Sequence, residues 1–159
     1  MSHPSDKPAT PLPPATGMTF GIVVSEWNRE ITEALLQGAV DRLRQAGADE
    51  RNIIISHVPG SFEIPLGAQL LAEKPHPDAI ICLGCVIQGE TPHFDYICQG
   101  VTMGVSELNL KYNKPFIFGV LTTRNIDQAR QRAGGKLGNK GDEAAATAIR
   151  MVHLQKIDR

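Results

Sequence analysis

The chain has 159 residues, of which 42% are hydrophobic and 21% are charged, a balance typical of a single globular domain. The formal net charge of −1 leaves no long-range field that would attract nucleic acid or an acidic membrane surface. The chain has no apolar stretch of membrane-spanning length, no apolar signal core and only three cysteines. We therefore expect a soluble cytoplasmic protein without a disulfide framework.

Residues 1–16 contain five of the 11 prolines and almost no large apolar side chains. This composition predicts a flexible, partly extended N-terminal tail. The rest of the chain, residues 17–159, is expected to form one α/β domain.

Strands and helices alternate along that domain. Short β-branched, apolar runs predict four strands, at 18–25, 51–58, 79–87 and 115–121. Apolar residues at helical spacing predict helices at 29–46, 62–73, 91–112, 125–133 and 142–154. Asn28, Thr91 and Asn125 are the expected N-caps. This order predicts a parallel sheet with helices on both faces.

Ligands of such folds bind beyond the carboxyl ends of the strands. Four loops are expected there, at 26–28, 59–63, 88–93 and 122–125, and the unusual polar residues of the chain gather in them. This convergence is the main functional prediction that the pattern supports.

The segment from Gly89 to His93 begins the third predicted loop-to-helix junction. Free backbone amides in the first turn of a helix favour an anion such as phosphate. An imidazole beside a bound phosphate ester can accept and return a proton. From this segment alone, a phosphate site with a base and a capping turn with a surface histidine are equally supported.

Two other loops carry candidate ligand groups. Glu63 can accept hydrogen bonds from an amide or a diol, or simply favour the dipole of its helix. Trp27, the only tryptophan, can stack on a flat ring or pack in an interface. Arginines suited to a phosphate follow the fourth strand, at positions 124, 130 and 132. Cys82 and Cys85 lie within a strand, which favours buried hydrophobes over a redox or zinc site.

Four ordered motifs resemble those of the lumazine synthase family, and the resemblance covers about residues 18–155. They are VPGSFEIP at 58–65, GCVIQGETPHFD at 84–95, FGVLTT at 118–123, and RAG at 132–134 followed by GNKG at 138–141. The resemblance implies a flavodoxin-like three-layer sandwich. It also implies a transferase of riboflavin biosynthesis that needs no metal or organic cofactor.

Members of that family condense 5-amino-6-(D-ribitylamino)uracil with 3,4-dihydroxy-2-butanone 4-phosphate and release phosphate and water. By motif position the resemblance makes His93 the proton-transfer residue, Arg132 the phosphate-binding arginine and Trp27 the ring that stacks on the pyrimidine. The implied phosphate loop is Glu90 and Thr91. The implied ribityl and pyrimidine contacts are Ser61, Phe62, Glu63, Cys85, Val86 and Ile87. Phe118 and Lys140 match groups contributed across a subunit boundary.

The resemblance also implies an assembly. The family forms pentamers with active sites between neighbours, and some members form icosahedral 60-mers. The resemblance also implies riboflavin synthase as a partner. The short loop 134–141 resembles that of the cage-forming members. Trp27 stands where many relatives have phenylalanine. A riboflavin synthase of the same fold and a non-catalytic flavin-binding or shell protein are the alternatives.

Overall fold

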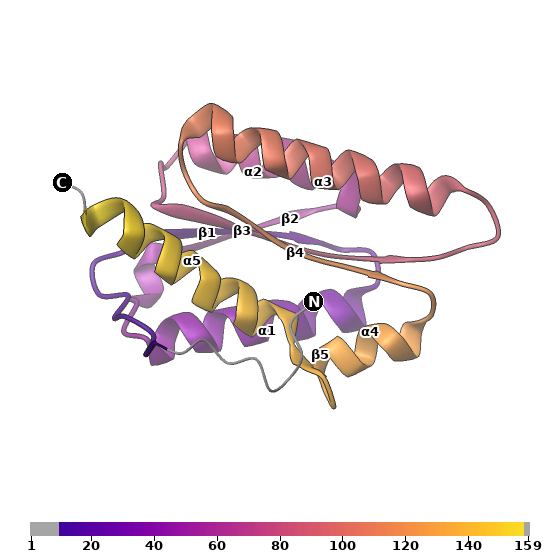
Figure 1. The fold of residues 1–159 in the computed structure, drawn as a ribbon, viewed down its shortest axis with the longest axis horizontal. Helices are drawn as coiled ribbons and strands as arrows, with labels where there is room; N and C mark the ends of the chain where they lie inside the picture. The colour runs from indigo at the N-terminus through magenta and orange to yellow at the C-terminus, as the bar shows by residue number, and fades with distance from the viewer. Residues whose placement is uncertain (1–9, 158–159) are drawn as a thin grey trace.

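The computed structural model describes residues 10–157, which form a four-stranded parallel sheet between two layers of helices (Figure 1). The strands follow the order β2-β1-β3-β4 across the sheet. Their bounds are β1 Phe20–Ser25, β2 Ile53–Val58, β3 Ala79–Ile87 and β4 Phe116–Thr123. The helices are α1 Arg29–Gln45, α2 Ile64–Glu73, α3 His93–Tyr112, α4 Ile126–Arg132 and α5 Lys140–Ile157, with 3₁₀ turns at Glu50–Asn52 and Ser61–Glu63. The predicted α/β three-layer architecture is confirmed.

The central strand β3 shows why both faces are covered. Its side chains alternate between the two faces, and Ala79 to Cys85 are all buried. Leu83 and Cys85 pack in the core under α1 and α5, whereas Ile80 and Cys82 pack in the core under α2 and α3. Figure 1 shows the same division, with α2 and α3 on one side and α1, α4 and α5 on the other.

Of the three predicted N-caps, Asn125 is confirmed, Asn28 has the predicted position without a capping bond, and Thr91 is wrong. Asn28 occupies the N-cap position of α1, but its φ of 59° is left-handed and its side chain makes no capping hydrogen bond. The Asn28 amide instead donates to the carbonyl of Cys85 at 2.9 Å. Thr91 does not cap α3, because that helix begins at His93 with Pro92 in the cap position. Asn125 does cap α4, accepting from the Gln128 amide at 2.9 Å.

The segment 134–141, expected to be a loop, contains a short antiparallel hairpin of β5 (Ala133–Gly135) and β6 (Gly138–Asn139). Helix α5 starts at Lys140, two residues earlier than expected, because the Asn139 side chain accepts from the Gly141 amide at 2.8 Å. Asn139 also donates to the carbonyl of Ala34 at 2.9 Å. At Gly141 the start of α5 crosses α1 so closely that any Cβ would collide with the carbonyl of Leu35. Asn139 and Gly141 of the GNKG motif are therefore explained by the contact between the start of α5 and α1.

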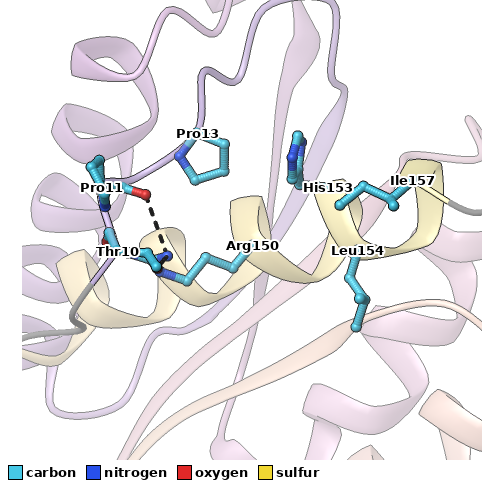
Figure 2. Close-up of a pocket in the computed structure, with 7 residues that line it drawn as sticks. All are labelled: Thr10, Pro11, Pro13, Arg150, His153, Leu154 and Ile157. Carbon is cyan, nitrogen blue, oxygen red and sulfur yellow. Dashed lines mark hydrogen bonds between the residues drawn. The ribbon is translucent and has the colours of Figure 1, made fainter.

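Thr10 to Pro13 lie against the last turns of α5, and the Ala15 amide donates to the carbonyl of Ala46 after α1 at 2.8 Å. Residues 1–9 of the expected tail lie outside the described residues. Arg150 donates to the carbonyl of Thr10 at 2.8 Å and to its hydroxyl at 3.0 Å, and Ala15 is fully buried. A pocket of about 310 Å³ lies between this segment and the last turns of α5 (Figure 2). It is lined by Thr10, Pro11, Pro13, Arg150, His153, Leu154 and Ile157. None of these residues belongs to the four loops.

None of the helices within residues 10–157 is long and apolar enough to span a membrane.

Candidate active site

The four loops predicted to form a site are joined to one another at the carboxyl edge of the sheet. The loop after β1 is held to the loop after β2, since the amide of Glu26 donates to Val58 at 2.8 Å and that of Trp27 to Pro59 at 3.1 Å. The loop after β3 is held to the end of β4 by the amide of Gln88, which donates to Thr123 at 2.8 Å. Asn28 joins the first loop to β3. The scaffold therefore fixes the relative positions of these loops.

Trp27, Gly60 and Glu63 form one compact group at this edge. A Cβ at Gly60 would come within 2.6 Å of the Trp27 ring and 3.1 Å of the Glu63 carboxylate, so the glycine lets both side chains approach the turn. Glu63 accepts from the Gly60 amide at 3.0 Å, and the Gly60 carbonyl accepts from the Glu63 amide at 3.2 Å. The indole is 68% exposed. A flat ring face and a fixed carboxylate thus lie side by side and open to solvent.

The residues around this group form a wall. Ser61 is buried and its hydroxyl has no hydrogen-bond partner among the described residues. Phe62 is exposed, and its ring lies over Gly100 of α3, where a Cβ would come within 3.0 Å of it. Val86 and Ile87 are partly buried at the end of β3. The side chains assigned to the pyrimidine by resemblance therefore lie at the carboxyl ends of three neighbouring strands, β2, β1 and β3.

Cys85 completes that wall as a neutral group. Burial raises the pKa of the Cys85 thiol to about 11 and that of Cys82 to about 12. A thiol of such high pKa does not supply a thiolate nucleophile at neutral pH. The interpretation of both cysteines as small buried hydrophobes is confirmed.

The segment from Gly89 to His93 is exposed and leads directly into α3, a helix of 20 residues. His93 is the first residue of that helix, and Glu90 and Thr91 lie in the loop before it. In the first turn of α3 the Asp95 amide donates to the carbonyl of Pro92 at 3.0 Å, so the amides before it, of His93 and Phe94, are the ones able to hold an anion. The base and the potential anion site are thus adjacent in the structure.

Arg132, Phe118 and Lys140 are not brought to this edge within one chain. Arg132 ends α4, which lies on the opposite side of the sheet from α3 (Figure 1), and it donates to the carbonyl of Gln128 at 2.9 Å. Phe118 lies in the middle of β4, paired in register with Cys82. Lys140 begins α5, with its ammonium 3.2 Å from Glu143.

The other two arginines after β4 differ in their surroundings. Arg130 donates to both carboxylate oxygens of Glu30, at 2.7 and 3.1 Å, and lies 3.3 Å from Asp127. The hydrogen bond from Arg130 lowers the pKa of Glu30. Arg130 is therefore already neutralised by acidic neighbours. Arg124 is exposed at the end of β4, and its backbone amide donates to the side chain of Gln128 at 2.9 Å.

The sequence interpretation included Gly60 only as part of the loop 59–63 and missed one contributor to this edge, Gly84. Gly84 lies inside the buried strand β3, where a Cβ would come within 2.7 Å of the Ser61 hydroxyl. A glycine within a strand pattern often marks a close approach by another group, and this signal was present in the sequence. The bridging role of Asn28 had no such signal, because asparagine before a helix predicts a cap.

Known proteins resemble this chain over almost the whole domain. A family model described as 6,7-dimethyl-8-ribityllumazine synthase matches residues 17–156. A protein of that description from Cytophaga hutchinsonii is 62% identical over 141 residues, covering 89% of this chain and 89% of the relative. One from Parabacteroides distasonis is 58% identical over 143 residues, covering 90% and 89%. One from Porphyromonas gingivalis is 52% identical over 153 residues, covering 96% and 95%.

Proposed function

Because the chain belongs to the 6,7-dimethyl-8-ribityllumazine synthase family, it is an enzyme of riboflavin biosynthesis, and we propose that its catalytic site is the carboxyl edge of the sheet. There it condenses 5-amino-6-(D-ribitylamino)uracil with 3,4-dihydroxy-2-butanone 4-phosphate to form the lumazine, phosphate and water. The single observation that carries this assignment is that the Trp27–Gly60–Glu63 group lies on the same edge of the sheet as α3, with the ring of Phe62 from that turn against Gly100 of the helix.

The two halves of the edge suit the two substrates. The exposed Trp27 ring can stack on the pyrimidine, and the Glu63 carboxylate can accept from its amide or from a ribityl hydroxyl. Phe62 and the end of β3 supply apolar surface around the ring. The first turn of α3 would bind the phosphate of the butanone through backbone amides, next to the imidazole of His93.

The reaction then needs little beyond positioning and proton transfer. The primary amine of the pyrimidine attacks the ketone and forms an imine with loss of water. Removal of the proton on C3 of the imine allows phosphate to leave from C4, and the resulting enol tautomerises to a ketone at C3. The ribityl-bearing nitrogen then attacks this ketone and closes the new ring with loss of a second water. Holding two substrates in register supplies much of the rate. His93 would move protons between nitrogen and carbon, and the amides of α3 would stabilise the departing phosphate.

Assembly would complete the site. Arg132, Phe118 and Lys140 lie away from the loops within one chain, so a neighbour would have to supply them. Helix α3 also exposes Tyr96, Met103 and Leu110, which are seven residues apart and therefore share one face of the helix. Leu66 and Leu70 of α2 are exposed as well. An exposed apolar stripe of this kind marks an interface between copies. We propose a pentamer with shared sites, and a 60-mer of such pentamers.

The decisive experiment mixes both substrates with the purified protein and follows the absorbance and fluorescence of the lumazine. The expected result is lumazine formation well above the spontaneous rate, with one phosphate released per lumazine. A rate equal to the background would refute the proposed reaction. Supplying the lumazine alone tests the related riboflavin synthase activity, and production of riboflavin from it would favour that alternative.

A further inference from the structure

Arg132 and Lys140, two cations that the proposed function assigns to a neighbour's site, lie at the same end of the β5–β6 hairpin. Ala133 of β5 and Asn139 of β6 are paired in register. Arg132 precedes Ala133 and Lys140 follows Asn139, so each cation lies one residue beyond this pair. The place of both cations therefore depends on how this end of the hairpin is held.

The side chain of Asn139 holds that end to two helices. Its Nδ2 donates to the carbonyl of Ala34 in α1 at 2.9 Å. Its Oδ1 accepts from the amide of Gly141 at 2.8 Å and from that of Asp142 at 3.3 Å, in the first turn of α5. A single amide group thus joins β6 both to α1 and to the first turn of α5.

Helix α1 has a glycine where it meets this side chain. Gly38 lies in the interior of α1, where glycine is among the least favourable residues. A Cβ at Gly38 would lie 2.6 Å from Nδ2 of Asn139. Ala34 and Gly38 are four residues apart, so they share the face of α1 that lies beside β5 (Figure 1). The sequence of α1 therefore accommodates the same contact that Asn139 makes.

Other contacts hold the two helices together without holding this end of the hairpin. Arg42 of α1 donates to both carboxylate oxygens of Asp142, which keeps the start of α5 on α1. The amide of Leu137 donates to the carbonyl of Gln131 at 2.9 Å, which joins the turn of the hairpin to α4. Loss of the Asn139 bond to α1 should therefore loosen the hairpin where the two cations lie, while both helices stay in place.

We propose that Asn139 is a positioning residue for the phosphate of the butanone substrate. By holding β6 against α1, it fixes the direction in which Arg132 and Lys140 extend toward the site of a neighbouring copy. This inference rests on the proposed function for the identity of the substrate and for the shared site. It assigns a role to a residue whose side chain bonds within its own chain and touches neither substrate.

The test compares Asn139→Ser with wild type in the assembled protein. Serine is neutral and a good N-cap, so it keeps an acceptor for α5, but it is too short to reach Ala34. KM for the butanone phosphate should rise about fivefold to tenfold, the effect of losing one hydrogen bond, and KM for the pyrimidine should stay within about twofold. In an Arg132→Ala background the same change should have a smaller effect, because Asn139 acts partly through that arginine.

Gly38→Ala tests the same contact from the side of α1. The new Cβ should displace the Asn139 amide, although alanine favours the helix itself. The variant should therefore show the same selective rise in KM for the butanone phosphate without a weaker α1. Hydrogen exchange at the amides of residues 135–139 should be faster than in wild type in both variants, and exchange at residues 144–148 of α5 should be unchanged.

Asn109→Ser is the matched control. The Asn109 amide also joins two elements, since it donates to the carbonyls of Val105 and Phe116 and accepts from the Phe116 amide, but it does so at the amino end of β4. Thermal unfolding should show a loss of stability similar to that of Asn139→Ser, and both KM values should stay within about twofold.

Four results would each overturn the positioning role: an unchanged KM for the butanone phosphate in Asn139→Ser, equal increases in both KM values, equal effects with and without Arg132, or the same selective rise in Asn109→Ser. If the wild type forms no lumazine, the proposed function fails and the phosphate role of Asn139 fails with it. Hydrogen exchange still decides whether Asn139 holds the hairpin, and unchanged exchange at residues 135–139 would refute that link.

Discussion

The indole of Trp27 lies directly against the backbone of Gly60, at the centre of the candidate pyrimidine site. The point at which a Cβ of residue 60 would sit is 2.6 Å from Cε3 of the indole and 2.7 Å from its Cζ3. Both atoms belong to the six-membered ring of the indole. Phenylalanine at this position would have a smaller side chain than the two-ring indole. The size of the aromatic residue at position 27 is therefore coupled to the absence of a side chain at position 60.

This coupling predicts that Gly60→Ala will displace Trp27. Overlap between the new Cβ and the indole costs about 1–3 kcal/mol, so KM for the pyrimidine should rise about tenfold or more. The fluorescence of Trp27, the only tryptophan, should change as well. Trp27→Phe should relieve the collision, so that Gly60→Ala costs less in that background than in wild type. Additive effects in the double variant would show that the two residues are not coupled.

Arg132 and Arg130 form a second test, because they lie two residues apart with different surroundings. Arg132→Ala should raise KM for the butanone phosphate about tenfold or more, through loss of a charge-assisted contact, and change KM for the pyrimidine little. Arg130→Ala is the control, since Arg130 is paired with Glu30 and Asp127. It should leave both constants within about twofold. Steady-state kinetics with each substrate varied would measure this, and a similar rise for both substrates in Arg132→Ala would exclude a phosphate role.

The shared site predicts complementation between inactive subunits. His93→Ala should turn over slowly, because positioning survives, and Arg132→Ala should bind the phosphate substrate poorly. In oligomers formed by co-expressing the two variants in equal amounts, about a quarter of the sites combine a native His93 with a native Arg132 from the neighbour. The mixture should therefore recover about a quarter of the wild-type rate. Activity no higher than the average of the two variants would place both residues in one chain, and sedimentation would establish the oligomer.

The cysteines should react with iodoacetamide in a fixed order. Burial holds the thiol pKa at about 12 for Cys82 and about 11 for Cys85, so both remain neutral thiols at pH 8. The pKa of Cys98 is also raised by burial, with a smaller contribution from Asp95, but this residue is only partly buried. Peptide mass spectrometry should show Cys98 labelled first and the other two only in denaturant. Labelling of Cys85 in the native protein at the rate of Cys98 would contradict the interpretation of Cys85 as a buried, neutral thiol.

The sequence by itself determined the layers of this protein and the place of its site. Apolar runs in alternation with amphipathic helices predict a parallel sheet, because a strand buried on both faces must be apolar throughout, as β3 is. Since the strands are parallel, the loops after them must meet at one edge, and this brought Trp27, Glu63 and His93 to the same edge. The bounds of the four strands and five helices were also predicted to within a few residues, because apolar runs and helical spacing mark where each element begins and ends.

Only the tertiary structure decided which polar groups pair with which. Asn28 bonds to Cys85 instead of capping α1, because a contact with a distant strand replaced the local one. Asn139 keeps its local bond to the Gly141 amide and adds a bond to Ala34, 105 residues earlier in the chain. The clearance above Gly60 and Gly84 also depends on side chains from other elements. The placement of Arg132 on the far side of the sheet from His93 was likewise fixed by the path of α4. Local patterns determine which elements form, whereas the contacts between elements determine what each side chain can reach.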